Sequence, residues 1–167
     1  AAGRSSRRSG TAGTVTGRRD SGMENGKLPE NMLKRSVLKN ITGKSRELVS
    51  GAGVGRDSSV LQTGDGMCAV SGGAYELRVP STEQLAVCSM VNNLAASGAE
   101  AKALWMNLLL PVQTQEQQLK EVMRGVDAAC NRLGIALAGG HTQISDAVDK
   151  IFITGTGIGS MTGYRPG

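Results

Sequence analysis

Apolar residues recur at helical spacing just after Pro29, a residue that suits the first turn of a helix. These apolar residues are Leu33, Val37, Leu38 and Ile41. The sequence therefore predicts a helix that ends near Gly43. The segment SGAGVGR, residues 50–56, follows and predicts a glycine-rich loop.

Two short runs rich in β-forming residues come next, DSSVLQ at 57–62 and GMCAVS at 66–71. They are joined through Gly64, Asp65 and Gly66, which is a turn sequence typical of hairpins. The pattern predicts two strands paired in a hairpin.

Two longer helices are predicted further along the chain. The first begins at Pro80 with a capping box formed by Ser81 and Gln84, and it stops at Gly98. The second is marked by a core stripe that comprises Leu119, Val122, Met123, Val126, Cys130 and Leu133. Thr114 and Gln117 form its predicted capping box, and Gly134 closes it.

Three further apolar runs predict strands. Residues 101–111, AKALWMNLLLP, lack alternation, which is typical of a strand buried on both faces, and Pro111 ends the run. The runs IALAG at 135–139 and KIFITGTGI at 150–158 follow. The order of elements predicts an α/β fold, a mixed sheet with helices layered on one side.

The composition fits one domain with an aliphatic core, because the chain has only one Trp, one Phe and two Tyr among 167 residues. Glycine is frequent, with 24 residues. This exceeds the usual share of about 7% and indicates tight turns or close approach of the backbone to a ligand.

The net charge of +5 is concentrated in one segment, since residues 1–22 hold five Arg and one Asp and the rest of the chain carries only +1. Residues 1–22 have no hydrophobic periodicity and are expected to be a disordered tail. An expression scar, a read-through upstream of Met23, or a targeting or nucleic-acid-binding arm would each explain them. The domain itself, residues 23–167, shows no aromatic platform and no basic face, so nucleic acid is not expected as a partner.

The three cysteines, Cys68, Cys88 and Cys130, match no zinc-binding spacing and are expected to be reduced thiols. No apolar run approaches the ~20 residues of a membrane span. The sequence therefore predicts a cytoplasmic protein without membrane contact.

Two glycine-containing motifs are candidates for ligand binding. In the first, Gly51, Gly53 and Gly55 precede a strand, an order that excludes the dinucleotide fingerprint and the P-loop. This loop is either a flexible turn or a phosphate-facing loop, and Asp57 after it is either a metal ligand or an exposed residue at a strand end.

The second motif, AGGHTQ, holds Gly139, Gly140 and the only histidine, His141, at the predicted end of a strand. Paired glycines there would let a ligand approach the backbone, and ligands commonly bind at the carboxyl ends of strands in open α/β sheets. A lone histidine is more often structural than catalytic, so both interpretations stay open.

Taken in order, five segments resemble the N-terminal domain of the aminoimidazole ribonucleotide (AIR) synthetase-like superfamily. They are GxGxDSSVL, AVSGG, LAVCSMVNNLAASGAE, GIALAGGHTQ and IFITGTGIG. This superfamily includes the hydrogenase-maturation factor HypE, selenophosphate synthetase and thiamine-monophosphate kinase. The lead-in GKLPENMLKRSVLKN is most like that of the HypE branch, and the resemblance covers residues 26–160.

The resemblance implies an ATP-dependent enzyme with Mg²⁺ held by carboxylates. It also implies a homodimer whose sheets pair into a barrel, with the nucleotide near that interface. A second, C-terminal domain would complete the substrate site, and it is expected to be absent because the sequence stops near where it would begin. The nucleotide-binding residues implied are Gly53, Gly55, Arg56, Asp57, Asn92, Asn93, Gly139, Gly140, His141 and Thr142.

Several positions depart from the family pattern, which usually has an acid before Asp57, Asp in place of Asn93, and Thr-Asp in place of Gly72-Gly73. Related sequences also often place an acid at or two positions after His141. Only Asp57 keeps its carboxylate as a metal ligand, whereas Mg²⁺ in such sites is held by carboxylates together with phosphates. Arg56 is expected to contact a phosphate directly.

Three functions follow as hypotheses. The first is a nucleotide-binding module whose Mg²⁺ binding is weakened or lost and which binds without efficient turnover. The second is an active ATP-dependent enzyme, catalysing phosphoryl transfer or dehydration, that needs the missing half. The third is a degenerate fragment that acts only as a dimerising scaffold.

Overall fold

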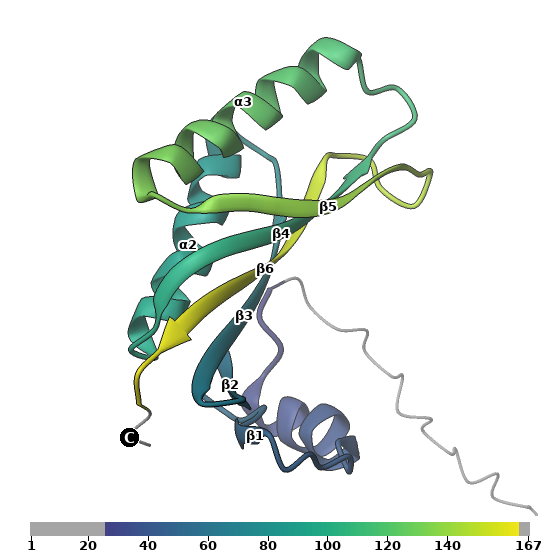
Figure 1. The fold of residues 1–167 in the computed structure, drawn as a ribbon. Coiled ribbons are helices and arrows are strands. Elements are labelled where there is room, and N and C mark those ends of the chain that lie inside the picture. The colour runs from purple at the N-terminus through teal and green to yellow at the C-terminus, as the bar shows by residue number, and fades with distance from the viewer. Residues whose placement is uncertain (1–25, 164–167) are drawn as a thin grey trace, which may run out of the picture.

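The computed structural model describes residues 26–163, and the predictions for the tail at 1–22 lie outside this range (Figure 1). The strands are β1 (Leu48–Ser50), β2 (Ser58–Thr63), β3 (Gly66–Glu76), β4 (Glu100–Leu110), β5 (Ala136–Ile144) and β6 (Phe152–Met161). The main helices are α2 (Thr82–Ala96) and α3 (Glu116–Leu133). The predicted hairpin, both main helices and the three later strands are all present.

The six strands form one mixed sheet in the order β1-β2-β3-β6-β4-β5. The β4–β5 pair is parallel, and the other pairs are antiparallel. The parallel pair follows from the crossover through α3, because a parallel connection needs a long return path. This confirms the predicted α/β fold with a mixed sheet.

Helices α2 and α3 lie on one side of the sheet, as the sequence predicts (Figure 1). Glycines of β6 allow α2 to approach closely: a Cβ at Gly155 would lie 2.6 Å from Met90 Sδ, and one at Gly157 would lie 3.0 Å from Leu94 Cδ1. The main core between the helices and the sheet is aliphatic and includes Val87, Met90, Leu104, Met106, Leu108, Val126, Cys130 and Ile153.

Among residues 26–163, neither α2 nor α3 covers the other face of the sheet (Figure 1). Along β4, the buried residues alternate with Trp105, which is 49% exposed, and with half-buried Asn107 and Leu109. On the neighbouring strand β6, Ile158 is 39% exposed. The prediction that residues 101–111 are buried on both faces is therefore wrong for the single chain, since only one face is covered.

Neither predicted capping box occurs as predicted. Ser81 adopts a left-handed conformation (φ 69°) and makes no side-chain cap, while the Gln84 side chain accepts a hydrogen bond from Arg132 of α3 at 3.1 Å. Helix α3 starts one residue later than predicted: Gln118 Oε1 accepts from the N–H of Gln115 at 2.8 Å. Its predicted stop is confirmed, because Gly134 has φ 64°.

The predicted first helix is shorter and less regular than expected. It consists of α1 (Glu30–Met32), a π-helical segment η1 (Leu33–Val37) and a 3₁₀ segment η2 (Leu38–Asn40). Its stripe is not buried, since Val37 is 42% and Ile41 56% exposed. In α3, Leu133 at the end of the predicted stripe is likewise exposed, and Ala129 is buried in the core. Strand β1 was not predicted.

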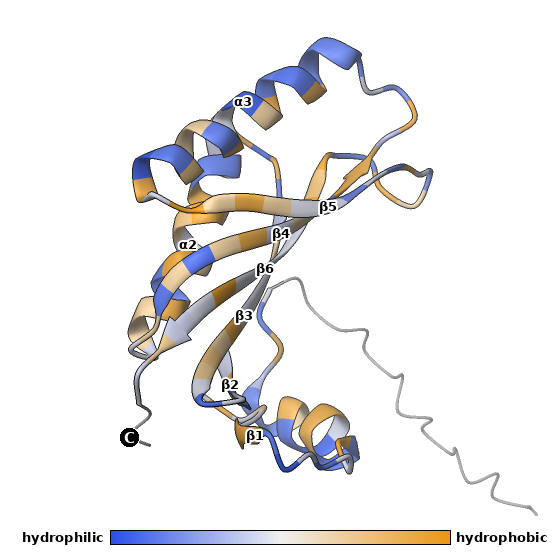
Figure 2. Cartoon of the chain, viewed as in Figure 1, coloured by the Kyte–Doolittle hydropathy of each residue, from blue (hydrophilic) through white to orange (hydrophobic). Residues whose placement is uncertain are grey.

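The hydropathy of the elements follows this arrangement (Figure 2). Helix α3 alternates apolar and polar residues, as expected for a helix with one buried face. Within residues 26–163, neither α2 nor α3 is both long and apolar enough to cross a lipid bilayer.

Candidate functional site

The glycine-rich loop connects β1 to β2 and folds around Arg56. The N–H of Arg56 donates to the carbonyl of Gly53 at 3.3 Å, and a Cβ at Gly53 would lie 3.2 Å from Arg56 Cδ. Gly55 has φ +73°, a conformation that L side chains rarely adopt. The loop therefore uses glycine at Gly55 to turn and at Gly53 to receive the Arg56 side chain.

Arg56 and Asp57 place opposite charges side by side at the start of β2, and both are exposed. Within residues 26–163, neither side chain forms an ion pair. The backbone of Asp57 is fixed, because its carbonyl accepts a hydrogen bond from Oγ of the buried Ser71 at 2.9 Å. The backbone is thus held at both residues, and the two exposed charged groups remain available to a ligand.

Asn93 lies on the flank of α2 that faces away from α3. Val91 packs against the core cluster that contains α3 residues, and Gln84, about two turns earlier on the same face, accepts a hydrogen bond from Arg132 of α3. Asn93 is two residues beyond Val91, about 200° around the helix, and is half-buried. The adjacent Leu94 packs in the cluster with Val60 of β2, so Asn93 lies on the β2 side of the helix.

Asn92 points in a different direction. It is exposed, and it lies between the half-buried flank positions on the face of α2 that is turned from the sheet. The structure therefore places Asn93 near the β2 side of the core and leaves Asn92 outside.

Gly73 of β3 is overlaid by a side chain from its own strand. A Cβ there would lie 2.6 Å from the ring atom Cε2 of Tyr75. Tyr75 is half-buried and packs against the main core. The space that a side chain at position 73 would occupy is thus filled by the tyrosine ring.

The motif at 139–142 lies inside β5, which continues to Ile144, so the prediction that it marks the end of a strand is wrong. Both glycines have packing roles. A Cβ at Gly139 would lie 2.6 Å from Cζ3 of Trp105, and a Cβ at Gly140 would lie 1.7 Å from the carbonyl oxygen of Met106.

A cavity of about 220 Å³ lies where β5 and β4 meet α3. It is lined by Met106, Leu108, Met123, Leu137, Gly139, Gly140, His141 and Thr142. His141 and Thr142 are exposed, and His141 Nε2 lies 3.3 Å from Gln143 Oε1. The lining is mostly apolar, so it offers few groups that would bind a phosphate.

The two glycine motifs are far apart within one chain. Strands β3, β6 and β4 lie between β2 and β5. At about 4.8 Å per strand spacing, that order separates the motifs by roughly 19 Å. Within one chain, Arg56 and Asp57 at the start of β2 are therefore separated from residues 139–142 on β5.

A carboxylate cage for a metal is not present in the described part of the chain. No three Asp, Glu, His or Cys side chains between residues 26 and 163 gather as metal ligands would.

Sequence reasoning missed Ser71, whose hydroxyl fixes the backbone of Asp57. Ser71 is 1% exposed and occupies an inward position of β3 next to Ala69. A polar residue at an inward strand position must find a hydrogen-bond partner, and that was the available signal.

Comparison with known proteins matches residues 52–161 to the family model of AIR synthase related proteins, N-terminal domain. A provisionally named hydrogenase expression/formation protein of Methanocaldococcus jannaschii is 29% identical over 143 residues, 80% of this chain and 42% of that protein. Carbamoyl dehydratase HypE of Escherichia coli is 32% identical over 80 residues, 47% of this chain and 24% of that protein. The chain thus spans less than half the length of these relatives.

Solved structures agree with the fold. A crystal structure of E. coli HypE aligns with a TM-score of 0.55 and 28% identity, covering 60% of this chain and 34% of that one. A structure of HypE in complex with ATP aligns with a TM-score of 0.54 and 21% identity, covering 83% of this chain and 42% of that one.

Proposed function

The chain belongs to the family of AIR synthase related proteins, N-terminal domain, and from this membership we propose that it binds ATP or a related nucleotide at the loop between β1 and β2. HypE, which binds ATP in one solved complex, supports the ligand class. The observation that carries the proposal is the exposed Arg56 side chain, which forms no ion pair within residues 26–163 and lies beside Gly53 and Gly55 in the loop.

Arg56 suits a phosphate because a guanidinium presents several N–H donors in one plane and stays charged at any physiological pH. Gly53 and Gly55 leave the backbone of the loop open to a ligand. Asp57 beside them accepts hydrogen bonds, and Asn93 supplies an amide from the β2 side of α2.

The proposal is binding without efficient turnover. The resemblance implies catalysis with Mg²⁺ held by carboxylates, and among residues 26–163 no three Asp, Glu, His or Cys side chains gather as metal ligands. With Arg56 in place of an acid, the charge of the phosphates is balanced by the protein itself. Mg²⁺ binding is accordingly weak or lost.

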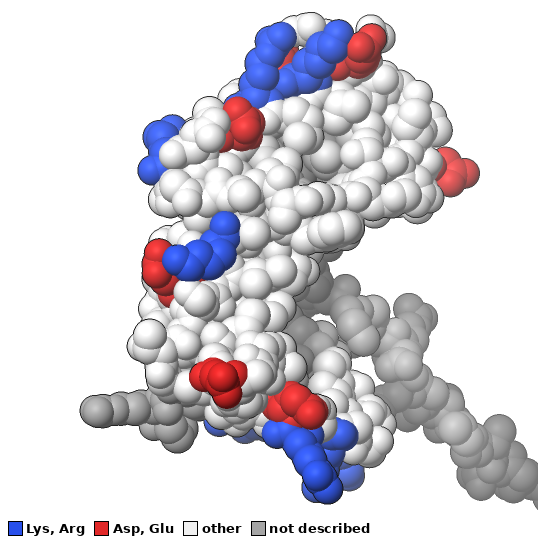
Figure 3. All heavy atoms as spheres, in the orientation of Figure 1, with Lys and Arg blue, Asp and Glu red and all other residues white. Residues whose placement is uncertain are grey.

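The proposal includes a homodimer through the open face of the sheet. Figure 3 shows this face with charged side chains at its ends and few over its centre. Trp105 and Ile158 are exposed there, and contiguous apolar surface of this kind commonly marks an interface. Two such faces packed together would form the barrel expected from the family.

A dimer would also give residues 139–142 a role in the nucleotide site. Within one chain, Gly139, Gly140, His141 and Thr142 are too far from Arg56. Across an interface made by the open faces, β5 of one chain can approach β2 of the other. Nucleotide binding would then require both copies.

The test is calorimetric titration of the 167-residue chain with ATP, once with Mg²⁺ and once with EDTA. Equal saturable binding in both supports the proposal. Binding that requires Mg²⁺ would contradict it and favour the active enzyme that needs a second domain. No binding in either would contradict it and favour a scaffold that only dimerises.

We also propose a cytoplasmic location for the chain, as the sequence predicts.

A further inference from the structure

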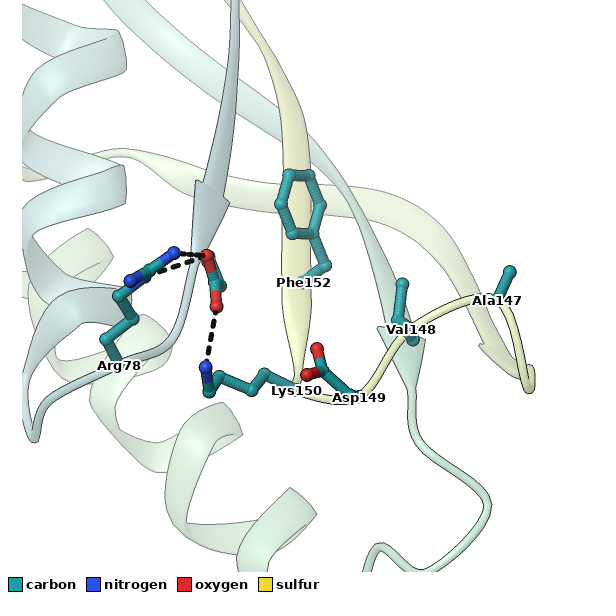
Figure 4. A pocket seen from close by; sticks show the side chains of 7 residues that line it. Arg78, Ala147, Val148, Asp149, Lys150 and Phe152 are labelled. Atoms are coloured by element: carbon teal, nitrogen blue, oxygen red, sulfur yellow. Dashed lines mark hydrogen bonds and ion pairs between the residues drawn. The ribbon is translucent and has the colours of Figure 1, made fainter. Parts of the chain in front are cut away.

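A second cavity, of about 330 Å³, lies between the end of β3 and the start of β6 (Figure 4). It is lined by Glu76, Arg78, Ala147, Val148, Asp149, Lys150 and Phe152. None of these residues belongs to the proposed nucleotide site. Its volume falls in the range of small-molecule sites.

The walls of this cavity are held by hydrogen bonds. The N–H of Leu77 donates to the carbonyl of Ile151 at 2.9 Å, which joins the end of β3 to the β5–β6 loop. The same loop is tied to β4, because the N–H of Ser145 donates to the carbonyl of Leu110 at 2.9 Å. The cavity is therefore formed by the end of β3, the β5–β6 loop and the start of β6, which backbone hydrogen bonds join to one another and to β4.

Glu76 positions two cations at one side of the cavity. Its Oε2 accepts from Arg78 Nε at 2.8 Å and lies 2.6 Å from Nη2, and its Oε1 lies 3.2 Å from Lys150 Nζ. The hydrogen bond from Arg78 holds the pKa of Glu76 below its ordinary value. Desolvation opposes this shift, and Lys150 adds to it. Glu76 therefore stays charged, and each of its two oxygens contacts a cation.

Both cations keep unused donors. Arg78 commits two of its five N–H groups to Glu76, and Lys150 commits one of its three. Their side chains are 66% and 47% exposed, so these donors can reach a ligand.

The other side of the cavity carries the opposite charge. Asp149 and Val148 lie on the side away from Arg78, Asp149 directly beside Lys150, and the ring of Phe152 lies above Lys150 and Asp149 in this view (Figure 4). Within residues 26–163, Asp149 forms no ion pair. The cavity thus has a cationic pole, an anionic pole and an apolar wall.

We propose that this cavity binds a small zwitterion of the α-amino-acid type. The ligand carboxylate contacts Arg78 and Lys150, its ammonium group contacts Asp149, and its apolar side chain packs on Phe152. The site goes beyond the proposed nucleotide binding and does not depend on it.

The charge balance favours a zwitterion over a simple anion. The four ionised lining residues sum to zero, two acids against two bases. A phosphate would be attracted by the cations and repelled by Asp149. A ligand with two separated poles satisfies both sides, and each charge-assisted hydrogen bond adds to affinity and orientation.

The test is a titration of the ¹⁵N-labelled 167-residue chain, followed by amide shifts, with four probes. They are phenylalanine, 3-phenylpropanoate (which lacks the ammonium group), phenethylamine (which lacks the carboxylate) and inorganic phosphate. Phenylalanine is expected to shift the amides of residues 147–152 saturably. The other three are expected to bind at least about tenfold more weakly, since each lacks one charged contact.

Two variants separate the poles. Asp149→Asn should weaken phenylalanine about tenfold and leave 3-phenylpropanoate unchanged or improved. Asp146→Asn, in the same loop and outside the cavity lining, is the matched control and should change neither. Lys150→Met should weaken both ligands, and its amide spectrum will report whether the loop keeps its fold.

The proposal is overturned by any of three results. Phenylalanine leaves residues 147–152 unshifted at about 10 mM; a single-pole probe or phosphate binds as well as phenylalanine; or Asp146→Asn weakens phenylalanine as much as Asp149→Asn does. Because the amides of the 51–57 loop are observed in the same spectra, failure here is distinct from failure of nucleotide binding.

Discussion

Gly140 of β5 lies so close to Met106 of β4 that a Cβ at Gly140 would be 1.7 Å from the Met106 carbonyl oxygen. The two residues are register partners in the parallel pair. The neighbouring pair, Trp105 and Gly139, is also tight, with the indole ring 2.6 Å from a Cβ at the glycine. The paired glycines thus set how closely β5 joins the sheet.

Gly140→Ala should lower the free energy of unfolding by about 3 kcal/mol or more, because backbone must move to relieve the clash. Urea denaturation measures this. Gly72→Ala in β3 is the control, since the nearest atom to its Cβ would be 3.6 Å away. Equal losses for the two variants would mean that β4 and β5 are not packed this closely.

Arg56→Gln should weaken ATP binding about tenfold, with or without Mg²⁺, because it removes a charge-assisted contact to a phosphate. Arg46→Gln, an exposed arginine before β1, makes the same change of charge outside the loop and should have little effect. If both variants lose affinity equally, the attraction is general electrostatics and not a contact of Arg56.

Asn93→Asp should raise Mg²⁺ affinity by about tenfold, because it adds a carboxylate on the β2 side of α2, where we expect the metal to bind. Asn92→Asp is the matched control, since Asn92 is exposed on the other side of the helix. Calorimetric titration with MgCl₂ distinguishes the two. An equal gain for both would show that added charge, and not position, is responsible.

Combining Asn93→Asp with Gly73→Asp should raise Mg²⁺ affinity further only if the Tyr75 ring moves, because a Cβ at Gly73 would lie 2.6 Å from it. We expect the double variant to cost stability, and the triple variant with Tyr75→Ala to relieve the contact. No change in Mg²⁺ affinity in either would contradict the idea that these positions face the metal site.

Trp105→Arg should convert the proposed dimer to a monomer at micromolar concentration, because it places a charge in the centre of the open sheet face. Leu85→Arg is the control, since Leu85 is 64% exposed on α2, which covers the opposite side of the sheet. Sedimentation velocity reports the mass. A wild-type chain that is already monomeric would refute the dimer.

Cys130 should be unreactive toward a thiol reagent in the native chain and react on unfolding. Burial raises the pKa of its thiol, and the nearby Asp127 adds to the shift. The neutral thiol stabilises the folded chain fully at a pH below the pKa of Cys130 in the unfolded chain. This stabilisation is lost as the pH rises through the higher pKa of Cys130 in the folded chain. Cys68 and Cys88 are only partly buried and should react first. If Cys130 in the native chain were labelled as fast as Cys68 and Cys88, the core around α3 would have to open readily.

Local patterns in the sequence determined the elements and their order. The hairpin at Gly64–Gly66, the helix closed by Gly134 and the apolar stripe of α3 depend on residues close together in the chain, so periodicity and turn chemistry predict them. The glycine loop and the position of Asp57 before β2 could be predicted for the same reason.

Contacts between distant segments decided the rest. The Gln84 side chain accepts a hydrogen bond from Arg132 of α3, 48 residues away, and does not form a capping box. Gly139 and Gly140 allow Trp105 and Met106 of β4 to lie close to β5, a contact that no local pattern in the sequence encodes. The cavity at Glu76, Arg78 and Lys150 likewise joins the end of β3 to a loop more than 70 residues later. A sequence reports what each segment favours, whereas burial, side-chain partners and ligand sites depend on which faces the fold brings together.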